Sequence, residues 1–113
     1  MNVAIVGCRT SKDYKFFKNN LPDLNITRII SGGSSGIDSL AKRYALEENI
    51  EYMEFLPDWN TRGLAAGPIR NKKIVDAAEY MVAFWDGKSK GTKSAIKLAK
   101  QKGIPVEIIM FKF

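Results

Sequence analysis

The chain has 113 residues, a formal net charge of +6, one cysteine and no histidine. This length predicts one domain over residues 1–113. The missing histidines exclude a Ser-His-Asp triad, a Cys-His pair and a histidine-ligated metal, and one cysteine cannot build a zinc site or an internal disulfide. The positive charge favours an anionic partner, such as a nucleotide or a nucleic acid.

The composition also bears on where the protein works. No apolar run approaches the roughly 20 residues that span a bilayer, and no basic segment precedes the first apolar run. The single Cys8 fits a reducing compartment. We therefore expect a cytoplasmic protein with no membrane partner.

The first half of the chain predicts strand, helix and strand in alternation. Residues 3–6 (VAIV) are a short apolar strand that ends at Gly7, and residues 27–31 are a second strand. Ser11 is the expected cap of the helix between them. That helix carries apolar residues on one face: Tyr14, Phe17 and Leu21. The next helix has apolar residues at helical spacing: Ile37, Leu40, Ala41, Tyr44 and Ala45.

The second half continues the alternation. The expected elements are a strand over residues 51–56, a helix over 66–78, a strand over 80–85, a helix over 90–102 and a strand over 106–111. Pro57 closes the first of these, and Gly103 stops the last helix.

This alternation predicts a Rossmann-like, doubly wound parallel sheet of five strands, with helices on both faces. The first, second and fourth strands are continuously apolar, as central strands are. The third and fifth carry Glu51, Glu54 and Glu107, which edge strands tolerate. The strand order is therefore expected near 3-2-1-4-5, with a ligand crevice where the order reverses, at the carboxyl ends of the strands.

Glycines and polar side chains gather where the strands end, so they should meet on one rim of the sheet. They are Gly7, Arg9 and Thr10 after the first strand; Gly32, Gly33, Ser34, Ser35, Gly36 and Asp38 after the second; Asp58, Trp59, Gly67, Pro68, Arg70 and Asn71 after the third; and Asp86, Ser89, Gly91 and Thr92 after the fourth. Such a rim predicts a concave polar pocket with free backbone N–H groups.

Phosphate binding is the chemistry that fits this pocket. Helix N-termini present unpaired N–H groups and a partial positive charge, and serine and threonine hydroxyls add donors. Arg9 and Arg70 can hold phosphate in a bidentate fork. Asp38 or Asp58 can accept from ribose hydroxyls, and Trp59, expected in a loop, can stack on a base.

Simpler roles remain open for several of these residues. Ser35 or Asp38 can serve only as a helix cap, and Gly36 only to permit the turn. Trp85 ends a buried strand, so packing is its expected role. Cys8 has no histidine to activate it and is interpreted as a small side chain. A stripe of lysines along the last helix is interpreted as a solvated face: Lys90, Lys93, Lys97 and Lys100.

Four segments together resemble the YspA/YpsA-related branch of the SLOG superfamily, which is named after the DNA-uptake protein Smf/DprA and the LOG cytokinin-activating enzymes. They are residues 3–10 (VAIVGCRT), 31–38 (SGGSSGID), 66–71 (AGPIRN) and 83–92 (AFWDGKSKGT). Cys8 stands where the family usually has serine. The resemblance implies a Rossmann-like sheet that binds nucleotides or nucleotide-derived signals. Some relatives act in bacterial antiviral systems that use ADP-ribose-like messengers.

The resemblance also allows a test for catalysis. LOG enzymes hydrolyse the N-glycosidic bond of a nucleoside monophosphate with an Arg before the fourth strand and a Glu three residues after a Gly-Thr pair. Arg70 and residues 91–92 (GT) match, but Ala95 stands at the Glu position. Binding without turnover is therefore favoured. An enzyme of this type would have to rely on Arg70, Asp38 and Asp86.

The expected function is to bind a phosphorylated, ribose-containing ligand, such as an ADP-ribose or cyclic-nucleotide signal, as a sensor or a sequestering sponge. A phage protein that opposes nucleotide-based immunity would act in this way. LOG-like hydrolysis is one alternative. Single-stranded DNA binding is another, since residues 31–46 resemble DprA most strongly. We expect a homo-oligomer that needs no cofactor and no metal.

Overall fold

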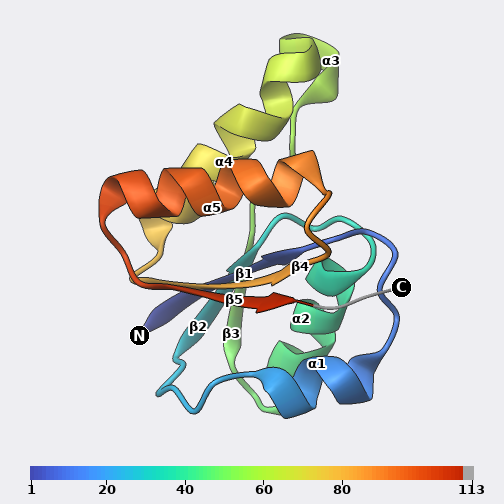
Figure 1. The fold of residues 1–113 in the computed structure, drawn as a ribbon, viewed down its shortest axis with the longest axis vertical. Coiled ribbons are helices and arrows are strands. Elements are labelled where there is room, and N and C mark those ends of the chain that lie inside the picture. Colours follow the sequence, from blue (N-terminus) through green and yellow to red (C-terminus); the bar gives the residue numbers. More distant parts are fainter. Residues whose placement is uncertain (111–113) are drawn as a thin grey trace.

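The computed structural model describes residues 1–110, which form a five-stranded parallel sheet in the order β3-β2-β1-β4-β5 (Figure 1). The strands are β1 (Asn2–Gly7), β2 (Arg28–Ser31), β3 (Glu51–Glu54), β4 (Tyr80–Trp85) and β5 (Val106–Met110). In the central pair, Val3 lies opposite Tyr80 and Gly7 lies opposite Phe84. The predicted order is confirmed, and β1 and β4 flank the point where it reverses.

Helices cover both faces of the sheet, as the doubly wound fold requires. The longer ones are α1 (Tyr14–Asn20), α2 (Ile37–Glu47), α4 (Ala66–Ala77) and α5 (Lys90–Lys102). Figure 1 shows α1 and α2 on one side and α4 and α5 on the other. A short helix, α3 (Trp59–Arg62), and the 3-10 helix η1 (Gly63–Ala65) stand beyond α4, away from the sheet. Within residues 1–110, no helix is long and apolar enough to cross a membrane.

The two faces are packed with side chains of different size. Under α1 and α2, the rings of Phe17 and Phe84 are fully buried, with centroids 4.9 Å apart. Under α4 and α5, small side chains predominate where the helices meet the sheet: Ala4, Ala83, Ala95 and Ala99. Small residues let a helix approach the sheet closely, so α5 lies near the ends of β1 and β4.

Three local predictions are wrong. Ser11 does not cap α1, because the carboxylate of Asp13, nearer the helix, accepts the Phe16 N–H at 2.9 Å. β3 ends at Glu54, before the predicted residue 56. Trp59 is not in a loop but begins α3. The predicted end of the last strand, Phe111, lies outside the described residues.

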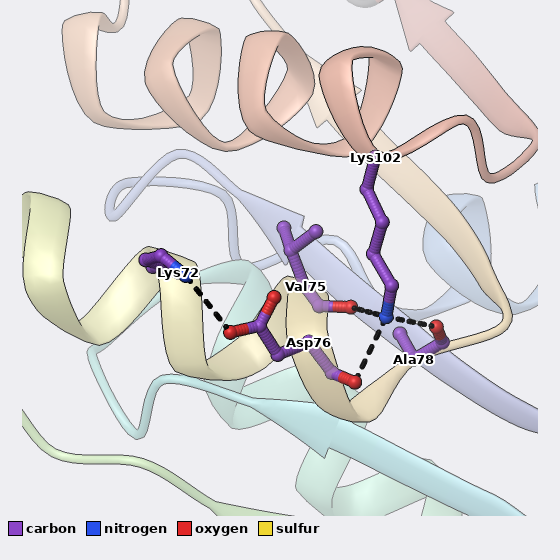
Figure 2. A network of polar contacts seen from close by, with 5 residues as sticks. All are labelled: Lys72, Val75, Asp76, Ala78 and Lys102. Carbon is purple, nitrogen blue, oxygen red and sulfur yellow. Dashed lines mark hydrogen bonds and ion pairs between the residues drawn. The ribbon is translucent and has the colours of Figure 1, made fainter.

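A lysine closes the C-terminus of α4, which has no glycine cap. The Nζ of Lys102, in the last turn of α5, donates to the carbonyl oxygens of Val75 at 2.9 Å, Asp76 at 2.8 Å and Ala78 at 3.4 Å (Figure 2). Because the final carbonyls of a helix lack partners within it, a cation placed there satisfies them. Lys102 thus ties the end of α4 to the end of α5.

Candidate functional site

A polar pocket opens at the carboxyl ends of β1, β2 and β4. It has two lobes that share four residues: Arg9, Gly32, Ser34 and Arg70. The lobes lie where the sequence predicts the crevice, because the chain leaves β1 and β4 in opposite directions across the sheet.

The inner lobe is small and polar, with a volume of about 60 Å³. Besides the shared residues, it is lined by Val6, Gly7, Asp38, Asn71, Ile74, Ser89, Gly91, Thr92 and Ala95. One water needs roughly 10–15 Å³ by this kind of measure, so the lobe has room for a small group. The first turn of α5 borders it with Gly91 and Thr92, and the N-terminus of a helix favours an anion.

The outer lobe is larger, about 380 Å³, which falls within the roughly 300–1,000 Å³ of known ligand pockets. Its further lining residues are Gly33, Ser35, Leu56, Pro57 and Trp59. The indole of Trp59 is half exposed there. An apolar surface beside a polar inner lobe suits a ligand with a planar, weakly polar group at one end and a charged group at the other.

The glycine-serine loop lies against the end of β1. Gly36 has a φ of +74°, which favours glycine, and a Cβ there would overlap the carbonyl groups of Cys8 and Arg9. The N–H of Ile37 donates to the Cys8 carbonyl at 3.1 Å, and the Ser35 hydroxyl donates to the Arg9 carbonyl at 3.1 Å. The loop is thereby fixed beside Arg9.

Asp38 faces back into this loop. It is buried, and its Oδ2 accepts from the hydroxyl of Ser34 at 2.6 Å and from the Ser34 N–H at 3.2 Å. Burial raises the pKa of Asp38 above the ordinary 3.8, while the hydrogen bonds from Ser34 and the charge of Arg70 oppose the rise. Neither Asp38 nor Ser35 caps α2: Gly36 occupies the N-cap, with no side-chain hydrogen bond.

Arg70 is held at the junction of the two lobes. Its Nη1 donates to the Gly32 carbonyl at 2.9 Å, and its Nε donates to Oδ1 of Asn71 at 3.0 Å. Asn71 in turn donates to the Gly91 carbonyl at 3.2 Å, which fixes α4 to the start of α5. Burial lowers the pKa of Arg70, yet a guanidinium stays protonated in proteins.

The two arginines of the pocket are placed to bind an anionic ligand. Within residues 1–110, neither Arg9 nor Arg70 forms an ion pair with a carboxylate. Over the same residues, Nη2 of Arg70 makes no hydrogen bond to protein. A doubly charged anion in the inner lobe would meet two guanidinium groups, of which Arg70 also interacts electrostatically with Asp38.

The turn before α5 is shaped by its own side chains. Ser89 caps the helix by accepting the Thr92 N–H, and the two hydroxyl oxygens lie 3.2 Å apart. Oδ1 of Asp86 accepts from the N–H groups of Lys88 at 2.9 Å and Ser89 at 2.8 Å, which lowers the pKa of Asp86. Asp86 therefore organises this turn and does not line the pocket.

The pocket unites most of the residues that the sequence singles out. It contains Gly7, Arg9, Gly32, Gly33, Ser34, Ser35, Asp38, Trp59, Arg70, Asn71, Ser89, Gly91 and Thr92. The other predicted residues line neither lobe: Thr10, Gly36, Asp58, Gly67, Pro68 and Asp86. Asp58, for example, caps α3 by accepting the Thr61 N–H at 3.2 Å.

Some lining residues were not predicted. They are Val6, Ile74, Leu56, Pro57 and Ala95. Ala95 carried a usable signal, since it lies one turn after Gly91 on the same face of α5. No local sequence pattern marks the other four residues, because their places in the pocket depend on how α4 and the end of β3 pack.

A parallel 3-2-1-4-5 sheet with a glycine-rich pocket at the point of reversal defines a Rossmann-like protein. The model of the family described as "YspA, cpYpsA-related SLOG family" matches residues 1–61. The chain belongs to this family, as the four sequence segments predict.

Among curated proteins, the chain is similar to the gene 61 protein of Mycobacterium phage D29. The two are 36% identical over 116 aligned residues, which cover 92% of each chain. It is also 31% identical over 86 residues to translation initiation factor IF-2 of Campylobacter jejuni strain RM1221. That alignment covers 76% of this chain but only 10% of the initiation factor.

Among solved structures, the fold is similar to that of DNA processing protein A. The Helicobacter pylori protein superposes with a TM-score of 0.70, covering 96% of this chain and 64% of that one. The Streptococcus pneumoniae protein gives 0.73, covering 99% and 51%. Both are 20% identical, so the likeness is one of fold. The chain spans about half to two thirds of these proteins.

Proposed function

We propose that this protein binds a phosphorylated, ribose-containing ligand of the ADP-ribose or cyclic-nucleotide type and does not transform it. The observation that carries the proposal is the two-lobed pocket with Arg9 and Arg70 at its junction, neither of which forms an ion pair within residues 1–110. Two arginines without an ion-pair partner in this range, beside a helix N-terminus, favour a phosphate group.

The two lobes divide the ligand between them. The inner lobe receives phosphate, which accepts from the hydroxyls of Ser89 and Thr92 and lies at the N-terminus of α5. The outer lobe receives the base, against Trp59 and Leu56. The ribose then lies near Arg70, where its hydroxyls can donate to the carboxylate of Asp38.

The carboxylates that the structure describes near the pocket support binding over hydrolysis. Ala95 places a methyl group in the inner lobe where LOG enzymes carry glutamate. Among the described residues, the carboxylates expected nearby are engaged by N–H or hydroxyl donors: Asp38, Asp58 and Asp86. A carboxylate held in this way is poorly placed to stabilise an oxocarbenium-like centre.

The biological role that we favour is sequestration of a nucleotide messenger, with sensing as the alternative. The similarity to a mycobacteriophage protein over 92% of both chains supports a phage setting. A phage protein that removes a messenger from solution would blunt antiviral signalling by mass action alone, since binding at high occupancy requires no catalysis.

The test is to identify what the pocket retains. Purified protein is incubated with a mixed pool of nucleotides and ADP-ribose derivatives, washed and denatured, and the released small molecules are measured by mass spectrometry. We expect an intact ligand at about one per pocket. Arg70→Ala should abolish retention, whereas Arg43→Ala, on the exposed face of α2, should not. Recovery of free base with ribose phosphate would overturn the proposal in favour of hydrolysis.

Single-stranded DNA binding is the second candidate. DNA processing protein A of Helicobacter pylori, which shares the fold, binds single-stranded DNA, and the +6 charge of this chain would favour such a partner. This candidate predicts an affinity that rises with strand length and falls steeply with salt. If the protein binds a single nucleotide-type ligand, as proposed first, a mononucleotide should saturate the pocket, and longer strands should bind no more tightly.

A further inference from the structure

A second hollow lies outside the pocket, where α5 meets the outer part of the sheet at β5. We call it the lysine groove. Its lining residues are Trp85, Lys93, Ile96, Lys97, Lys100, Gln101 and Ile108. Its volume is about 520 Å³, and its exposed surface is mainly apolar. None of these residues lines the inner or the outer lobe.

The rim of the groove is positively charged and uncompensated. Lys93, Lys97 and Lys100 are exposed, and within residues 1–110 none of them forms an ion pair. The sequence of α5 contains no acidic residue. Lys102 differs from these three, because its Nζ is occupied by the carbonyl groups at the end of α4 (Figure 2).

The groove borders an open edge of the sheet. β5 is the last strand, and over the described residues it pairs only with β4. Ile108 faces the α5 side, where it packs with the core beneath that helix. The backbone groups along the other edge of β5 are therefore available to another strand, as in complexes formed by strand addition.

We propose that the lysine groove binds an extended acidic segment of a partner protein, which adds as a strand beside β5. Alternate side chains of such a strand point to the same side. Apolar ones would pack on Trp85, Ile96 and Ile108, and carboxylates at the segment's rim would meet the lysines.

The lining favours a polypeptide over a nucleic acid or a second copy of this chain. The floor is largely aliphatic, and the N–H of its one indole, in Trp85, already donates to the Ser89 carbonyl at 3.1 Å. Strand addition at the open edge needs alternating N–H and C=O groups along the partner's backbone, which a sugar-phosphate backbone does not supply. A second copy seated in the groove by the same face would place another lysine rim against this one, and the two rims would repel each other.

The groove is also linked to the pocket. Ser89, which accepts the Trp85 N–H, caps α5 and lines the inner lobe. A segment seated on Trp85 would therefore lie one hydrogen bond away from the proposed phosphate site. The docking proposal does not depend on that site being filled, and its test uses the protein without nucleotide.

The experiment measures binding of synthetic peptides by NMR on ¹⁵N-labelled protein. The probe is a peptide of about eight residues that alternates Glu with Val and Ile. Its controls are the same peptide with Lys in place of Glu and an oligothymidylate of equal length. We expect the acidic peptide alone to shift the Trp85 indole N–H and the backbone amides of β5.

A pair of charge-matched variants completes the test. Lys97→Glu should weaken the acidic peptide about threefold to tenfold, because one attraction becomes a repulsion. Lys15→Glu makes the same change on α1, on the opposite face of the sheet (Figure 1), and should leave the affinity unchanged. The proposal is overturned if the peptide shifts no signal of Trp85 or β5, if oligothymidylate shifts them instead, or if the two variants weaken the peptide equally.

Discussion

At the scale of single residues, Arg70 is the side chain on which ligand binding should depend most. Arg70→Lys keeps the charge but loses the fork that reaches Gly32 and Asn71 together. We expect ADP-ribose, the probe, to bind about tenfold or more weakly, because a charge-assisted hydrogen bond contributes about 1.5–3 kcal/mol. Isothermal calorimetry measures the change. Equal affinities of Arg70→Lys and the unmodified protein would contradict this role.

Asp38 should make stability depend on pH. Its pKa is raised in the folded protein, so folding favours the protonated form. The resulting stabilisation is complete below the ordinary value of 3.8 and is lost as the pH rises through the raised pKa. Asp38→Asn does not titrate. The free energy of unfolding of the unmodified protein, relative to that of the variant, should therefore fall over this range in urea titrations. A constant difference would show that Asp38 does not titrate as described.

The pocket illustrates which residue roles a sequence reveals. Arg9 could be placed there because loops after parallel strands meet on one rim. Arg70 and Asn71 could be placed there because they lie in the first half of the helix that follows the third strand. Asp86 could not be excluded from the predicted pocket. Its carboxylate is satisfied by N–H groups of its own turn, and no sequence pattern shows this in advance. The contribution of Leu56 depends on tertiary packing, which carries no local signal.

At the scale of elements, the contact of Lys102 with the end of α4 makes a measurable prediction. Lys102→Met keeps the aliphatic stem and removes the donor of three hydrogen bonds. The free energy of unfolding should fall by about 1–2 kcal/mol, since carbonyl groups at the helix end lose their partner. Urea denaturation measures the effect. Lys100→Met is the matched control and should change stability little. Equal losses in both variants would refute the capping role.

The elements whose bounds were predicted correctly have clear signals in the sequence at both ends. β4 is a continuous apolar run, and α5 lies between a serine that caps it and Gly103, which has a φ of +87°. α3 was missed because it has only four residues, too few for apolar periodicity. The cap of α1 was misplaced because Ser11 and Asp13 are both good caps, and only the course of the chain selects one.

At the scale of the whole molecule, self-association stays a prediction. Leu56, Trp59 and Leu64 are exposed near α3, and 94% of Leu64 is accessible. Large exposed apolar side chains close together favour association. We expect a homo-oligomer in sedimentation equilibrium, and Leu64→Glu should shift it toward monomer. A monomer at all accessible concentrations would disprove this expectation.

The contact shown in Figure 2 also makes the lysines of α5 unequal as nucleophiles. An acylating reagent has to reach the amine nitrogen, and that of Lys102 is held against three carbonyl oxygens at the end of α4. Lys93, Lys97 and Lys100 should therefore be labelled first, with Lys102 following only when the end of α4 opens. The order in which these lysines are modified would then report how often the end of α4 opens. It can be measured on the intact protein without any engineered probe.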